Sequence, residues 1–129
     1  MRLRPALVLV ICCCLLGCAN HYNRDFTAAL EAQLEAPPPL GLGLSSHEYL
    51  TITSVYFVPN LFTPLLAGVA SQVFGAAACL LVAAAVATLG NLVFIVGVVG
   101  AQPLAVLVAG RLCIGLSYEA LDAVWMPLL

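Results

Sequence analysis

A long stretch without any charged side chain restricts the fold of this sequence more than any other feature. No Asp, Glu, Lys or Arg occurs between Glu48 and Arg111. Soluble domains carry about a quarter charged residues, whereas this chain has 64% hydrophobic and 8% charged residues. We therefore predict an all-α transmembrane protein embedded in a lipid bilayer, because a helix satisfies its backbone hydrogen bonds within its own segment.

Several functional classes are excluded by what the sequence lacks. Its four basic residues are too few for a nucleic-acid interface. The six cysteines include no Cys-x-x-Cys pair beside a histidine cluster, which is the spacing typical of a zinc site. We find no phosphate-binding loop and no nucleophile beside a positioned base, and so expect no cofactor, no metal and no enzymatic activity.

Hydropathy divides the chain into four expected membrane spans and one polar loop. The spans are expected at residues 5–22, 49–70, 76–100 and 104–125. The loop is expected at 23–48 on the non-cytoplasmic side, with a short helical piece at 26–36. Arg2 and Arg4 favour a cytoplasmic N-terminus by the positive-inside rule. The second span contains Pro59 and Pro64, which predict a kink whose freed backbone groups are satisfied by nearby hydroxyls.

Small residues mark the third span as a close-packing helix. They recur at helical spacing and form one smooth stripe: Ala83, Ala87, Gly90 and Gly97. Small residues let membrane helices approach closely. Because residues 101–103 alone separate this span from the next, we expect the third and fourth spans to form a tight antiparallel hairpin.

The first span has a second interpretation. Its apolar core ends in the letters LLGC at Cys18, which resembles the cleavage box of a signal-led lipoprotein. Leu16 is larger than the residue usual at that place in the box, and the rest of the chain is not a soluble payload. A true first span is favoured, and a cleaved leader remains the alternative.

Three charges lie inside the fourth expected span and need a physical explanation. With Arg111 at zero, Asp122 lies at about 20° and Glu119 at about 80° around the helix. Each charge at the bilayer centre costs about 2.5–3.5 kcal/mol on the insertion scale. We expect this helix face to point into a helix bundle or to line a water-filled pathway for a solute. The alternative for Arg111 is a structural role, held by carbonyls or acids of a neighbouring helix.

Four motifs in order resemble the major facilitator superfamily, and within it the lysosomal dipeptide transporters. They are AAL (28–30), YFVPN (56–60), GNLVFIVG (90–97) and GRLCIGLSYEAL (110–121). The resemblance implies the first four helices of the N-terminal six-helix half, with alternating access to a central solute site. It also implies substrate-binding roles for Glu119, Arg111, Asn60 and Tyr56, with Glu119 at the amino end of a dipeptide.

The sequence departs from that family in three places. Ser71 and Gln72 stand where the superfamily usually has an Asp-Arg pair, which removes the usual cytoplasmic latch. Trp125 replaces a glutamine. The chain has no counterpart of helices five to twelve, so we interpret it as a truncated transporter that needs further helices, with an accessory subunit or homodimer left open. A small four-span scaffold protein is the remaining alternative.

Overall fold

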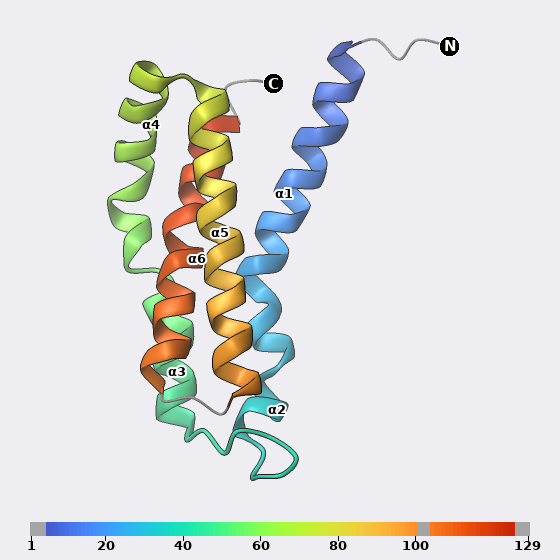
Figure 1. Cartoon of the computed structure of the whole chain (residues 1–129), viewed down its shortest axis with the longest axis vertical. Helices are drawn as coiled ribbons and strands as arrows, with labels where there is room; N and C mark the ends of the chain where they lie inside the picture. Colours follow the sequence, from blue (N-terminus) through green and yellow to red (C-terminus); the bar gives the residue numbers. More distant parts are fainter. Residues whose placement is uncertain (1–4, 101–103, 126–129) are drawn as a thin grey trace.

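The computed structural model describes residues 5–100 and 104–125, and every regular element there is helical (Figure 1). This confirms the all-α prediction. The helices are α1 (Pro5–Ala29), α2 (Glu31–Glu35), α3 (Ser46–Val55), α4 (Thr63–Phe74), α5 (Ala76–Val99) and α6 (Leu104–Trp125), and a 3-10 turn, η1 (Pro59–Leu61), lies between α3 and α4. The long helices run alternately up and down (Figure 1).

Among the described residues, three helices are long and apolar enough to cross a membrane. They cover Leu7–Ala29, Ala76–Val99 and Leu104–Val124. The pair Ser46–Leu61 and Thr63–Phe74 bends by 46° and makes a fourth if the pair is one span. The protein is therefore a candidate multi-pass integral membrane protein. Its first helix continues past the expected end of the first span, Tyr22, into the region that was expected to be a loop.

The bend between α3 and α4 has a local cause in the two prolines of this segment. A proline nitrogen carries no hydrogen, so the backbone ladder is interrupted here. Pro59 begins η1, and Pro64 stands in the first turn of α4, where a missing N–H is tolerated. The Thr63 hydroxyl donates to the Pro59 carbonyl at 2.7 Å. The 46° bend confirms the predicted kink.

Helices α5 and α6 pack closely along the small-residue stripe. The buried residues of α5 are Ala83, Ala87, Gly90, Phe94 and Gly97. A Cβ at Gly90 would lie 2.9 Å from the Gly110 carbonyl oxygen, so the two backbones nearly touch there. This confirms that the third and fourth expected spans pair. The expected turn at 101–103 lies outside the described residues.

The loop between α2 and α3 closes one end of the bundle. Leu42 and Leu44 pack against a core cluster of Ile52, Phe94 and Leu107. Helix α3 then begins with a capping box, in which Ser45 and Glu48 satisfy one another's backbone N–H groups. The loop is therefore folded over the helix ends, at the end of the bundle where α1 finishes and α6 begins (Figure 1).

Candidate functional site

The guanidinium of Arg111 is the most deeply buried charge among the described residues. Arg111 is 1% exposed. Its Nη1 donates to the carbonyl of Asn23 at 3.0 Å, and its Nη2 donates to the carbonyl of Arg24 at 3.2 Å. Both carbonyls belong to α1, so the structural role weighed for this residue is present. Arg111 ties α6 to α1 through main-chain oxygens.

Two aromatic rings cover the same guanidinium. Its Cζ lies 4.6 Å from the centroid of the Tyr56 ring and 5.3 Å from that of Phe26. Cation–π contacts of this kind stabilise a desolvated cation. Among the described residues no carboxylate lies within ion-pair distance of Arg111. Carbonyl dipoles and ring faces therefore stabilise the guanidinium, which keeps its net positive charge.

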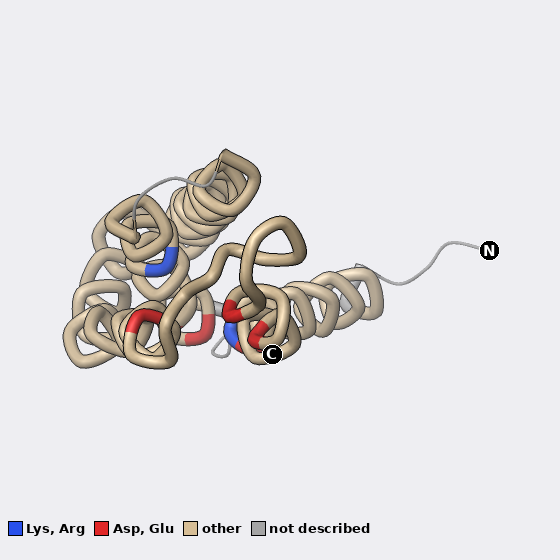
Figure 2. Tube along the Cα trace, turned by 90° about the horizontal axis from the view of Figure 1, so that it is seen from below, with Lys and Arg blue, Asp and Glu red and all other residues tan. Residues whose placement is uncertain are grey.

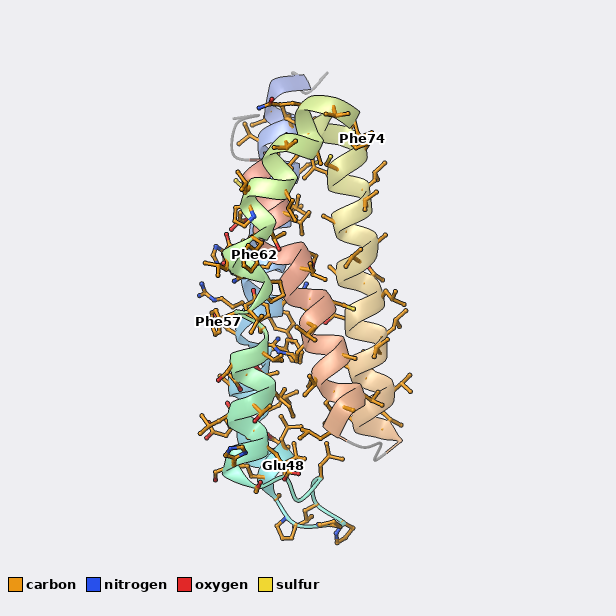
Figure 3. The ribbon with its side chains drawn as sticks, turned by 90° about the vertical axis from the view of Figure 1, so that its left-hand side faces the viewer. Glu48, Phe57, Phe62 and Phe74 are labelled. Atoms are coloured by element: carbon orange, nitrogen blue, oxygen red, sulfur yellow. The ribbon has the colours of Figure 1, made fainter. Side chains whose placement is uncertain are left out.

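Three buried polar atoms, one on α6 and two at the break between α3 and α4, have no hydrogen-bond partner within the described part of the chain. They are Arg111 Nε, Tyr56 OH and Asn60 Oδ1. Tyr56 is fully buried, whereas Phe57 and Phe62 are exposed on the outer side of the bend (Figure 3). An unpaired buried polar group costs about 1–3 kcal/mol. Such a cluster at a helix break calls for a functional explanation.

A second set of polar side chains joins α1 to α6, and we call it the α1–α6 clasp: Asn20, His21, Arg24, Tyr118 and Asp122. Asn20 Nδ2 donates to the Tyr118 carbonyl at 3.1 Å and to Asp122 Oδ1 at 3.0 Å. The Tyr118 hydroxyl lies 3.0 Å from His21 Nδ1 and 3.4 Å from Arg24 Nη1. The clasp extends the polar contacts of Arg111 with α1 farther along α6. We call the side of α6 that makes these contacts, from Arg111 to Asp122, the polar seam.

The four residues expected to bind substrate do not form one cluster. Arg111 and Tyr56 are in contact, and Asn60 lies in the bend just beyond Tyr56. Glu119 is partly exposed and makes no hydrogen bond or ion pair with the described residues. It stands about 12 Å farther along α6 than Arg111, at 1.5 Å per residue. Glu119 therefore has access to the surroundings that Arg111 lacks.

Most members of the clasp were not expected from the sequence. The segment around Asn20 and Arg24 was assigned to a span end and a loop, and Tyr118 was not singled out. One signal was available: Asn20 and Arg24 are four residues apart, so they lie on one face of a helix. Figure 2 shows that charged positions occupy a few turns of the trace while most of it is uncharged.

A groove between α4, α5 and α6 is a poor candidate for the binding site of a polar solute. It holds about 610 Å³. The hydroxyls of Thr63 and Ser117 lie on its wall, but both donate to carbonyls one turn earlier in their own segments, Pro59 and Ile114. The groove offers an apolar surface, in contrast to the seam beside α1. Its lining residues are Thr63, Leu66, Ala67, Ala70, Phe74, Ala78, Cys79, Val82, Ala83, Val86, Leu116, Ser117, Ala120 and Val124.

No family model, no curated protein and no solved structure matches the chain, so comparison with known proteins assigns it to no family. The site must therefore be interpreted from its own residues.

Proposed function

We propose that this protein belongs to a solute transporter of the major facilitator type and moves dipeptides or similar small solutes across a membrane by alternating access. In this proposal the chain supplies the first four helices of the N-terminal half, and further helices complete the pathway. The order of the four sequence motifs supports the proposal, as does the polar seam along α6. Lysosomal placement and the absence of an enzymatic role are parts of the same proposal.

One observation carries the proposal: Arg111 is buried in a candidate membrane helix without an acidic partner among the described residues. Ionisable residues inside membrane segments are costly and mark solute or ion pathways by default. Transporters also place their sites at discontinuous helices, and Arg111 contacts Tyr56 beside such a break.

Glu119 provides the sharpest test of transport. The full chain is reconstituted in liposomes at a protein density that lets copies associate, so that further copies can supply the additional helices, and uptake of labelled alanyl-alanine is compared with that of protein-free liposomes. We expect uptake above that background, and Glu119→Gln should lower its initial rate about tenfold, because a charged hydrogen bond to the peptide amino group is lost.

Thr88→Val is the matched control, because the exposed Thr88 hydroxyl bonds only the Ala84 carbonyl of its own helix at 2.8 Å. The control should transport like the wild type at equal protein content. Unchanged uptake by Glu119→Gln would remove this carboxylate from the pathway. Wild-type uptake equal to that of empty liposomes would reject transport by this chain and by assemblies of its copies.

A further inference from the structure

We propose that Arg111 and Tyr56 together form a binding site for the carboxylate group of a small organic acid or peptide. This inference rests on the proposed function, because it names the chemical group that the same seam would recognise. It assigns to the two side chains a shared ligand, whereas the observed contacts alone give them only a structural association.

The unpartnered atoms of the pair match the hydrogen-bonding needs of a carboxylate. Arg111 Nε can only donate a hydrogen bond, and the Tyr56 hydroxyl can also donate one. Both atoms are buried, and neither finds an acceptor within the described residues. A carboxylate has two oxygens that accept several hydrogen bonds, and bonds from a guanidinium to it are among the strongest in proteins. One such ligand can therefore satisfy both donors.

The local charge also favours an anion. Asp25 stands between Arg24 and Phe26, which both contact Arg111. Its carboxylate pairs with Arg24, whose Nε lies 2.8 Å from Asp25 Oδ1. Two carbonyls and two rings surround Arg111 without neutralising its unit charge. A cation or a neutral hydrogen-bond donor at this place would leave the charge unbalanced. A carboxylate would balance it.

Arg111 and Tyr56 are 1% and 0% exposed, so a ligand could reach them only if the break between α3 and α4 moved. Tyr56 is the C-cap residue that follows α3, and the 3-10 turn begins three residues later at Pro59. Its carbonyl rests directly on Gly115 of α6, where any side chain would collide with it. Gly115 lies one turn after Arg111, so this close approach sets the Tyr56 ring over the guanidinium. A shift of the break would lift the ring and admit a ligand.

The arginine content of the chain permits a direct binding measurement. All four basic residues are arginines, so the full chain labelled with ¹⁵N-arginine in lipid nanodiscs gives four Nε–H signals. Arg111→Lys identifies one of them by its loss. The probes are sodium acetate, glycylglycine and the uncharged analogue acetamide, titrated at constant ionic strength.

We expect acetate and glycylglycine to move the Arg111 signal saturably, and acetamide to leave it in place. Tyr56→Phe keeps the ring but removes the hydroxyl, and should weaken acetate binding about tenfold. Tyr22→Phe makes the same change on an exposed ring, 72% exposed, and should bind like the wild type. This comparison does not depend on the folding of the Arg111→Lys variant.

Two results would overturn the site. One is an Arg111 signal that stays fixed or moves only in step with the other arginine signals. The other is an unchanged acetate affinity in Tyr56→Phe. Failure of the site and failure of transport are distinguishable: uptake without a shift of Arg111 rejects the site alone, and a saturable shift without uptake rejects transport alone.

Discussion

Helix α6 is held to its two neighbours in opposite ways. Its contact with α5 uses Gly90, Gly97 and Gly110, which bring the two backbones close together. Its contact with α1 uses polar side chains and the Arg111 guanidinium. Inside a bilayer lipid tails are as apolar as leucine, so helices associate through close packing or hydrogen bonds rather than the hydrophobic effect. This chain uses one of these means on each side.

The difference separates a rigid part of the molecule from an adjustable one. Packing between glycine backbones has a single good arrangement, since any displacement opens a gap or makes a clash. Hydrogen bonds among side chains can exchange partners with little loss. We therefore interpret α5 and α6 as the frame, and the contacts of α6 with α1 and α3 as the adjustable part.

The largest loss of stability is expected when a side chain is introduced into the close contact between α5 and α6. A Cβ at Gly110 would lie 2.8 Å from the Phe94 nitrogen and 2.9 Å from the Gly90 carbonyl oxygen. Gly110→Val should therefore force α5 and α6 apart and lower the free energy of unfolding by about 3 kcal/mol. Titration with sodium dodecyl sulfate in mixed micelles, followed by circular dichroism, measures this change.

Gly68→Val is the matched control, because a Cβ at Gly68 meets nothing within 4 Å. It makes the same substitution inside α4 and should change stability far less. Equal losses in the two variants would show that the cost comes from valine in a helix. In that case the frame would not depend on close backbone packing.

The two sides of α6 also differ in how far the sequence predicts them. The charge-free stretch, the small-residue stripe and the paired prolines predicted the all-helical content, the α5–α6 pairing and the kink. These features depend on local composition and spacing. The continuous course of α1 to Ala29 was not predicted, because Asn20 was placed near the end of the first span and Arg24 in the polar loop. The Asn20 side chain bonds Tyr118 and Asp122, which are 98 and 102 positions away, and Arg24 bonds its neighbour Asp25 and reaches Tyr118. A single sequence does not show such long-range pairing.

A smaller effect is expected when the clasp loses its central amide. Asn20 is 2% exposed and gives hydrogen bonds to the Tyr118 carbonyl and Asp122. Asn20→Leu removes both bonds while keeping a similar volume. Interhelical hydrogen bonds in membranes contribute about 0.6 kcal/mol on average, so the two should cost about 1 kcal/mol. The same detergent titration measures it, with Thr88→Val as the control.

Disulfide cross-linking tests whether Asn20→Leu loosens the contact between α1 and α6 in particular. Cysteine pairs placed across α1 and α6 in a chain whose own cysteines are replaced by serine should cross-link more slowly once Asn20 is leucine. Pairs across α5 and α6 should keep their rate. If Asn20→Leu lowered the free energy of unfolding as much as Gly110→Val does, the clasp would be part of the frame. The distinction between the two sides of α6 would then fail.

The smallest effect is expected at the ion pair beside the clasp. Arg24 and Asp25 are adjacent in sequence, and their side chains are 39% and 62% exposed. Exposed pairs contribute little, because solvent screens the attraction and two flexible side chains must be ordered. Asp25→Asn keeps the shape and leaves Arg24 free to donate to the Tyr118 hydroxyl. It should therefore produce no measurable change in detergent unfolding or in the α1–α6 cross-linking rate. If Asp25→Asn destabilised the chain as much as Asn20→Leu, the carboxylate would have to act on the seam itself. Its charge would then be a candidate counter-ion for Arg111, which would also weaken the case for a bound carboxylate.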